Sequence, residues 1–213
     1  TARKGVRIGD IHMADFLEKY EKLKQSHMQQ IANLNFDMNE LSLDGMTFSD
    51  YEKAWFEGIE YLKQYQFIDG EYYINEALDK GKKVLAEGAQ GSMLDVDFGS
   101  YPFVTSSNVI AAGVCSGLGI APCRIGKVFG IFKAYCTRVG TGPFPTELFD
   151  ETGEMLRQNG HEFGATTGRP RRCGWLDLPA LKYAVMLSGV TDLMMMKSDV
   201  MDDFETVKAA TAY

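Results

Sequence analysis

The 213-residue sequence is poor in the residues that would place it in several common protein classes. It has four cysteines, and none of them forms a C-x-x-C pair or has a histidine at ligand spacing: Cys115, Cys123, Cys136 and Cys173. This pattern disfavours zinc and iron–sulfur sites, and it favours reduced cysteines packed as small apolar groups. We therefore expect a cytoplasmic protein.

The sequence also lacks an excess of basic residues. Its 22 Lys and Arg stand against 29 Asp and Glu, which gives a net charge of −7. A chain of this charge does not hold nucleic acid by bulk electrostatics, so any polyanion site must be local. The hydrophobic content of 45% excludes general disorder and supplies a core for one large domain or two small ones.

Long apolar runs are absent as well. The stretch Phe98–Cys123 carries no formal charge, but prolines, glycines and Thr105–Asn108 interrupt it, whereas a membrane span needs ~20 mostly apolar residues. We expect no membrane span, and interpret this stretch as buried backbone close to a ligand or another element. Thr1–Arg7 lacks both an initiator methionine and the apolar run of a signal peptide, which predicts a chain that begins inside a longer protein.

The first part of the chain, residues 1–83, has a helical pattern. Mostly apolar residues recur at spacings of three and four, at Met13, Leu17, Tyr20, Leu23, His27 or Met28, Ile31 and Leu34. Thr47–Asp50 resembles a capping box that opens a second helix, whose predicted apolar stripe is Tyr51, Trp55, Ile59 and Leu62. His12 and His27 lie within these patterns and are interpreted as packed or surface side chains. We expect residues 1–83 to form a helical subdomain.

The second part, residues 84–213, has short apolar runs that end in small or polar residues. Val84–Ala86, Val128–Phe132 and Leu193–Met196 have the length expected of buried parallel strands with helices between them. This part is therefore predicted to be α/β. Ligands of such sheets collect beyond the carboxyl ends of the strands, so the residues that follow each run are the candidate site residues.

Two glycine-rich segments are candidates for nucleotide contacts. Glu87–Gly91 places one amide side chain, Gln90, between glycines, which suits the edge of a purine, although a plain turn explains the same pattern. Gly119–Val128 has the wrong glycine spacing for a phosphate loop, and Val128 stands where a Ser or Thr should bind Mg²⁺. The chain contains no recognisable phosphate loop.

Two charged motifs are more informative. Lys197–Asp199 follows the third apolar run, and an aspartate there can accept from N1–H and the N2 amino group of guanine; a solvated turn is the alternative. Gly164–Arg172 combines three arginines with two threonines in an acidic protein. Guanidinium groups bind carboxylate and phosphate, so this loop predicts an anion site, with a basic surface turn as the alternative.

Long stretches of the chain resemble the adenylosuccinate synthetase family. The matching stretches are Glu87–Gly91, Tyr101–Asn108, Lys133–Gly140, Gly142–Gly153, Phe163–Arg169 and Gly174–Asp177, together with Arg3–Asp10. The resemblance implies a P-loop-NTPase-like α/β fold with a mostly parallel sheet and an inserted helical subdomain. It implies a cytoplasmic purine-biosynthesis ligase that condenses IMP with L-aspartate at the expense of GTP, through 6-phosphoryl-IMP, with Mg²⁺ as cofactor.

The resemblance also assigns roles to residues. It implies IMP contacts at Arg3, Gln90, Thr105, Val139 and Arg169, with Arg3 acting across a homodimer interface that residues 1–83 help to form. It implies aspartate contacts at Ala165, Thr166, Thr167, Gly168, Arg169, Pro170 and Arg171. It implies GTP contacts at Arg171, Lys197, Ser198 and Asp199. Gln90 and Arg169 would also support catalysis.

The chain departs from the family pattern at its ends. The family's phosphate loop, catalytic aspartate and catalytic histidine precede Thr1, and the family continues beyond Tyr213. The resemblance therefore implies a central segment with no catalytic residue and no metal ligand of its own, with the Mg²⁺ ligands in the missing N-terminal part, and with no activity alone. Met196 replaces a residue that is often polar. The alternative is a non-catalytic guanine-nucleotide-binding or regulatory module.

Overall fold

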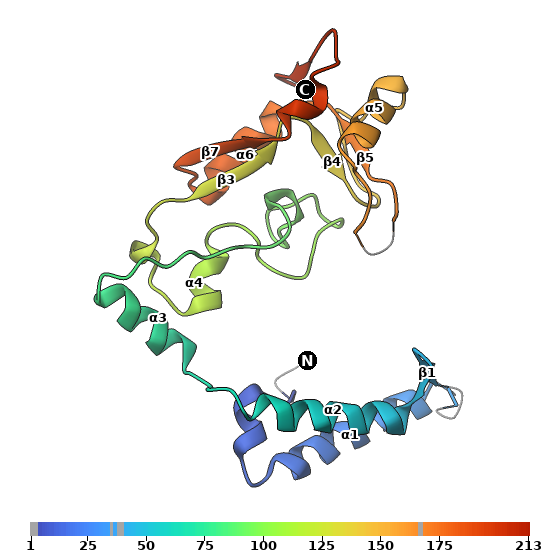
Figure 1. Cartoon of the computed structure of the whole chain (residues 1–213), viewed down its shortest axis with the longest axis vertical. Coiled ribbons are helices and arrows are strands. Elements are labelled where there is room, and N and C mark those ends of the chain that lie inside the picture. Colours follow the sequence, from blue (N-terminus) through green and yellow to red (C-terminus); the bar gives the residue numbers. More distant parts are fainter. Residues whose placement is uncertain (1–3, 35, 38–40, 166–167) are drawn as a thin grey trace. The chain divides into compact units, whose positions relative to one another are not determined.

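The computed structural model describes residues 4–34, 36–37, 41–165 and 168–213 (Figure 1). Its internal contacts divide the chain into unit 1, residues 1–69, and unit 2, residues 70–213. The division falls before helix α3 (Gly70–Asp79), because α3 contacts unit 2: Asn75 Nδ2 donates to Gly119 O at 3.0 Å, and Asp79 pairs with Arg124 at 2.8 Å. The boundary set by internal contacts, after residue 69, thus lies earlier in the chain than the boundary predicted from composition, after residue 83.

Unit 1 is mainly helical, as its pattern predicts. Its elements are η1 (Ile8–His12), α1 (Phe16–Ala32), β1 (Ser42–Leu43), β2 (Met46–Thr47) and α2 (Phe48–Leu62). The predicted capping box is confirmed, since Asp50 N donates to Thr47 Oγ1 at 3.3 Å and Thr47 N donates to the Asp50 carboxylate at 3.2 Å. This exchange satisfies two backbone donors and fixes the start of α2.

The buried face of unit 1 agrees with the predicted stripes in part: Ile59 is buried and Tyr20, Leu23, Met28 and Ile31 are half-buried, whereas Tyr51, Trp55 and Leu62 are exposed. Its core is Ile11, Phe16 and Ile59, while Leu17 and Met13 are exposed. The Tyr20 ring stacks on Trp55 with centroids 5.0 Å apart. Phe16 is buried because its ring packs against those of Trp55 and Phe56, at centroid distances of 6.2 and 6.3 Å.

Unit 2 has both helices and strands. After α3 its elements are η3 (Ser92–Leu94), α4 (Gly113–Leu118), η4 (Pro122–Arg124), β3 (Phe129–Lys133), β4 (Cys136–Arg138), α5 (Glu151–Asn159), β5 (Arg172–Gly174), β6 (Leu176–Asp177), α6 (Leu178–Ser188), β7 (Asp192–Met196), η5 (Ser198–Met201) and β8 (Ala209–Ala210). The described residues form four two-stranded sheets, of which β3–β7 and β6–β8 are parallel. The fold is mixed α/β.

Of the three apolar runs predicted to be strands in unit 2, two form strands and one does not. The runs at 128–132 and 193–196 lie in β3 and β7, which pair in parallel as predicted. Both strands are largely exposed along their apolar residues, so their predicted burial is wrong for this chain. The run Val84–Ala86 forms no strand, and Leu85 is 85% exposed, because no described strand lies beside it to accept its backbone hydrogen bonds.

The core of unit 2 lies between α5, β5 and η5. Its buried residues are Tyr135, Leu156, Cys173 and Val200. The Asp150 side chain caps α5 by accepting from Gly153 N at 3.1 Å, and Asp177 caps α6 by accepting from Ala180 N at 2.9 Å. These caps fix the helices that bring the segments at residues 135, 162, 171 and 197 together.

The uncharged stretch Phe98–Cys123 is not uniformly interior. Ile110 is buried, but Tyr101 and Phe103 are exposed. Its expected burial is therefore confirmed only in part, because in the described residues this stretch is wound into turns and the short helix α4 rather than a buried run. No helix of the described part of the chain is both long and apolar enough to cross a membrane.

Candidate functional site

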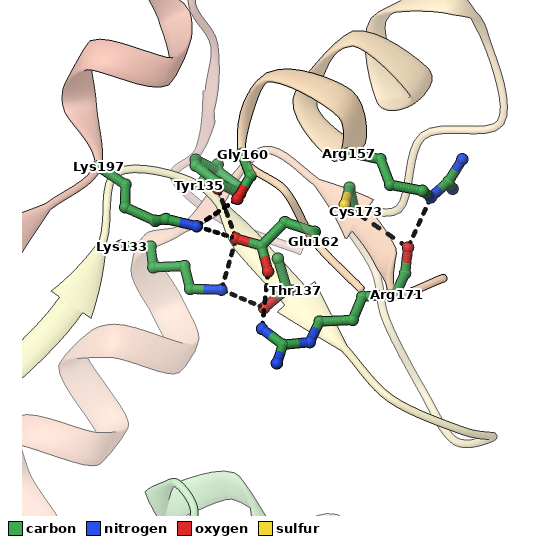
Figure 2. A network of polar contacts seen from close by, with 9 residues as sticks. All are labelled: Lys133, Tyr135, Thr137, Arg157, Gly160, Glu162, Arg171, Cys173 and Lys197. Atoms are coloured by element: carbon green, nitrogen blue, oxygen red, sulfur yellow. Dashed lines mark hydrogen bonds and ion pairs between the residues drawn. The ribbon is translucent and has the colours of Figure 1, made fainter. Parts of the chain in front are cut away.

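A buried carboxylate, Glu162, is the centre of a polar network in unit 2 (Figure 2). Its side chain has no exposed area. Oε1 accepts from the Tyr135 hydroxyl at 2.6 Å, from Lys133 Nζ at 2.8 Å and from Lys197 Nζ at 2.8 Å. Oε2 accepts from Arg171 Nη1 at 2.8 Å. One carboxylate therefore joins a hydroxyl and three cationic groups, which we call the Glu162 cluster.

The backbone explains how these segments meet. Lys133 is the last residue of β3 and lies opposite Met196 in the parallel register, so Lys197 follows the same sheet edge. Ala134 N donates to Met196 O at 2.9 Å and continues this pairing. Carboxyl ends of parallel strands are where ligands of α/β folds collect. The Glu162 cluster lies at this edge, and the prediction that a ligand binds there stays a prediction.

Two further backbone hydrogen bonds hold Glu162 and Arg171 near the ends of β3 and β7. Glu162 N donates to Arg157 O at 2.9 Å, and Arg171 N donates to Glu162 O at 2.9 Å. Gly160 leaves room for the cluster, because a Cβ there would collide with the Tyr135 hydroxyl. Arg157 Nε donates to Arg171 O at 2.8 Å, which fixes the start of β5.

The Glu162 cluster carries more positive than negative charge. Burial acts to raise the pKa of Glu162, but its bonds to Lys133, Lys197 and Tyr135 outweigh burial and lower that pKa to about 2. Burial lowers the pKa of Lys133, and Lys197 and Arg171 nearby act in the same direction. One carboxylate cannot balance three cations, so the arrangement favours an anion beside it.

The Lys197–Asp199 motif has an unusual backbone. Lys197 has φ 60° and ψ 33°, a left-handed conformation that is rare for a residue with a Cβ. Its ammonium also donates to Gly160 O at 2.5 Å, so it points into the Glu162 cluster. Ser198 and Asp199 begin η5 and are exposed. The carboxylate of Asp199 is therefore accessible, while the lysine ammonium is already bound within the protein.

The arginine loop is closed at its base. Gly164 N donates to Arg169 O at 2.8 Å, and Gly168, with φ 63°, donates to Gly164 O at 2.8 Å. Ala165, Gly168, Arg169 and Pro170 are exposed, whereas Thr166 and Thr167 lie outside the described residues. Arg171 is half-buried, and its Nε is buried without a hydrogen-bond partner in the described structure.

Arg172, the third arginine of the loop motif, faces away from the cluster. It pairs with Glu147, and its Nη1 donates to Gly140 O at 3.1 Å and Gly142 O at 2.9 Å. Arg138 donates to Thr141 O at 3.0 Å from the other side. The two arginines therefore hold the loop that carries Val139, which is 61% exposed.

Gln90 lies in a separate part of unit 2. It has φ 61° and lines a surface cavity of about 450 Å³, together with Val84–Ala89, Ser107–Ile110 and residues of α3 and α4. Of the described residues that line this cavity, none is Arg171, Lys197 or Asp199. The described structure thus brings Arg171 and Lys197 together, but it does not bring Gln90 to them.

Buried Asp95 shapes the segment beside this cavity. Its carboxylate accepts from four backbone N–H groups, those of Asp97, Phe98, Val109 and Ile110, at 2.7–3.3 Å. Burial acts to raise the pKa of Asp95, but these four donors lower it to about 2. Thr105 lies within the segment so held, and its N–H donates to Leu94 O at 2.8 Å.

Some predicted residues cannot be placed, and some important ones were not predicted. Arg3 lies outside the described residues, as do Thr166 and Thr167. Sequence reasoning missed the structural roles of Glu162, Asp95 and Arg138. A lone acidic residue two positions before the arginine loop motif was the only signal for Glu162.

Within the described residues, no group of three or more His, Cys, Asp and Glu side chains is placed to hold a metal ion.

Comparison with known proteins gives consistent results. A family model described as adenylosuccinate synthetase matches residues 1–213. The adenylosuccinate synthetases of Bacteroides fragilis and Phocaeicola vulgatus are 61% and 62% identical to this chain over 213 residues. Each match covers 100% of this chain and 48% of the relative, so the chain spans about half the length of these curated relatives.

Solved structures agree with this result. The fully ligated adenylosuccinate synthetase of Plasmodium falciparum has a TM-score of 0.83 and 39% identity, over 97% of this chain and 46% of that one. A succinoaminodeoxyadenylate synthetase of cyanophage S-2L, with a TM-score of 0.53, 23% identity and coverage of 71% of this chain and 50% of that one, shares the fold. These matches do not support the alternative of a separate regulatory module. The chain belongs to the adenylosuccinate synthetase family.

Proposed function

We propose that this chain is the central part of a longer, GTP-dependent ligase that joins IMP to L-aspartate and forms adenylosuccinate. The observation that carries the proposal is the match of the family model to the whole chain, supported by 61% identity to a named synthetase over the same length. The relatives are about twice as long as the chain, so the activity is proposed for a longer polypeptide that contains it.

The proposed reaction proceeds through 6-phosphoryl-IMP, which the amine of aspartate attacks. Phosphorylation turns the purine O6 into a good leaving group, and cationic side chains offset the charge that develops during transfer. In this chain the proposed cations are Arg169 and Arg171. The positive excess of the Glu162 cluster supports a role of Arg171 beside an anionic substrate.

The proposed contacts follow the family assignment. IMP would contact Gln90, Thr105, Val139 and Arg169, with its phosphate on Arg3 of a second subunit. Aspartate would bind the loop Ala165–Arg171, and GTP would contact Arg171 and Lys197–Asp199. The exposed carboxylate of Asp199 and the cavity at Gln90 support these roles, because both leave the group accessible to a ligand.

The remaining parts of the proposal concern the assembly and the metal. We infer a homodimer in which residues 1–83 contribute to the interface, a larger P-loop-like parallel sheet that β3 and β7 join, and a cytoplasmic location. Parallel sheets are normally covered on both faces, and the exposed apolar residues of β3 and β7 support such an extension. Mg²⁺ would assist phosphoryl transfer, but the described residues offer no set that fits it, so no step here is assigned to the metal.

The test is a steady-state assay of the complete protein and of this chain alone. The complete protein should form adenylosuccinate and GDP only when IMP, aspartate and GTP are all present. The 213 residues alone should give no product, because the proposed acid, base and phosphate loop are not part of them. A complete protein that forms no adenylosuccinate would refute the assigned function, and product from the chain alone would refute the division of roles.

A further inference from the structure

Glu162 lies where two proposed ligand-binding segments meet, and no ligand role is assigned to it. Its two carboxylate oxygens serve different segments: Oε1 binds Lys197, and Oε2 binds Arg171. These residues lie 35 and 9 positions away in the sequence. A change at Glu162 therefore acts on both segments together.

The backbone conformation of Lys197 depends on the contacts of its side chain. A left-handed backbone is unfavourable for lysine, so other contacts must hold it. Those contacts are the bonds of its ammonium to Glu162 Oε1 and Gly160 O, at 2.8 Å and 2.5 Å. Asp199 lies two residues later, and the conformation of Lys197 determines where its carboxylate points.

The position of the Arg171 guanidinium depends on the second carboxylate oxygen of Glu162, Oε2. Arg171 Nη1 is fixed by Glu162 Oε2, while its Nε has no partner in the described structure. Tyr135 and Lys133 bind Oε1 and keep the carboxylate from rotating. A neutral amide at this position accepts through one oxygen only, and its NH₂ group would face donors on the other side.

We propose that Glu162 is a positioning residue that sets Arg171 and the Lys197–Asp199 motif in one geometry, and so couples the aspartate-binding loop to the guanine-binding motif. The inference rests on the proposed function, because the two segments have ligands only if the complete protein is a synthetase. Glu162 itself need touch no substrate. It acts through the two cationic side chains that it holds.

The test is Glu162→Gln in the complete synthetase, with kcat and the KM of each substrate measured separately. The neutral amide has one acceptor oxygen, so one end loses its bond and the other keeps a weaker one; the KM of GTP and of aspartate should both rise, by ~10-fold or more at the end that loses its bond. The KM of IMP should rise by a smaller factor than the other two, because its proposed contacts Gln90 and Thr105 do not contact the cluster and only Arg169 lies in the same loop as Arg171. Glu147→Gln is the matched control: it also removes a carboxylate that is paired with an arginine, and it should leave the KM of GTP unchanged, because its partner Arg172 is not a member of the Glu162 cluster.

A second measurement separates positioning from general destabilisation. Lys197→Met removes the ammonium that Glu162 Oε1 binds, so in this background Glu162→Gln should raise the KM of GTP by a clearly smaller factor than in the wild type, because it acts on GTP only through Arg171. Equal effects in both backgrounds would overturn the proposal, as would equal increases in all three KM values. If Glu162→Gln does not fold, Tyr135→Phe decides: a rise in the KM of GTP that exceeds any rise in the KM of IMP supports the proposal, and an equal rise or no change overturns it. An inactive wild-type protein would instead refute the proposed function.

Discussion

We predict that the buried carboxylate of Glu162 makes the free energy of unfolding depend on pH in the acid range. Its pKa is lowered from the ordinary 4.5 to about 2 in the folded chain. A group whose pKa is lowered by folding stabilises the folded state above its unfolded pKa, and this contribution is lost as the pH falls toward the folded pKa. The contribution of Glu162 should thus be complete at pH 6 and should decline between about pH 4.5 and pH 2.

The size of the effect follows from the shift and from the exposure of the donors. A fall in pKa from 4.5 to about 2 corresponds to about 3 kcal/mol as an upper value. Lys133, Arg171 and Lys197 are 27%, 32% and 36% exposed, so water screens part of the attraction. We therefore expect about 2 kcal/mol of the free energy of unfolding to depend on the ionised Glu162.

Urea unfolding of this chain between pH 6 and pH 3 measures part of that amount. Trp55→Phe in every variant leaves Trp175, which contacts Phe204 in unit 2, as the fluorescent reporter. The chain with Glu162 should lose roughly 1–1.5 kcal/mol more than Glu162→Gln over this range, which is part of the ~2 kcal/mol, because a carboxylate with a pKa of about 2 is still largely ionised at pH 3 and glutamine does not titrate. Asp95 titrates in both variants and cancels. Parallel pH profiles would refute the reasoning, and so would a Glu162 carboxyl that titrates near 4.5 by NMR.

Two further predictions concern the cap of α2 and the proposed dimer. Thr47→Ala should lower the free energy of unfolding of unit 1 by about 1 kcal/mol, because it removes the capping bond to Asp50, and an unchanged urea midpoint reported by Trp55 would contradict the capping role. In the complete enzyme, Arg3→Leu should weaken IMP binding through loss of a charge-assisted contact of roughly 1.5–3 kcal/mol, and mixing it with Arg169→Leu should restore some activity through hybrid dimers. No recovery after confirmed subunit exchange would argue for a site within one subunit.

Local signals in the sequence were sufficient for some elements. The Thr47–Asp50 capping box and the parallel strands β3 and β7 depend on nearby residues, and their positions were predicted correctly. The α1 face was predicted correctly at Tyr20, Leu23, Met28 and Ile31, which are half-buried, but Leu17 is exposed. Spacing alone does not show that Phe16 packs against the rings of α2. Val84–Ala86 looked like a strand, but strand formation needs a partner strand that the local sequence does not specify.

The Glu162 cluster shows why the rest of the site was not predictable. The loop that carries the arginines was recognised from composition, since guanidinium groups beside glycines favour anion binding. The partner that binds Arg171 and Lys197 was not recognised, because its contacts join residues between 9 and 35 positions apart. Such contacts depend on the paths of β3, α5 and β7 rather than on a spacing within one motif.

The central claim is that this chain supplies the guanine-binding motif of a synthetase, and Asp199→Asn in the complete enzyme tests it most directly. The carboxylate is proposed to accept from both N1–H and the N2 amino group, and an amide keeps only one of these contacts. We expect kcat/KM for GTP to fall by orders of magnitude, since sites built to hydrogen-bond a group discriminate by ~10⁴ or more, with partial recovery for XTP, whose O2 can accept from the new NH₂. An unchanged kcat/KM for GTP with no response to XTP would contradict the claim and remove Lys197–Asp199 from the site.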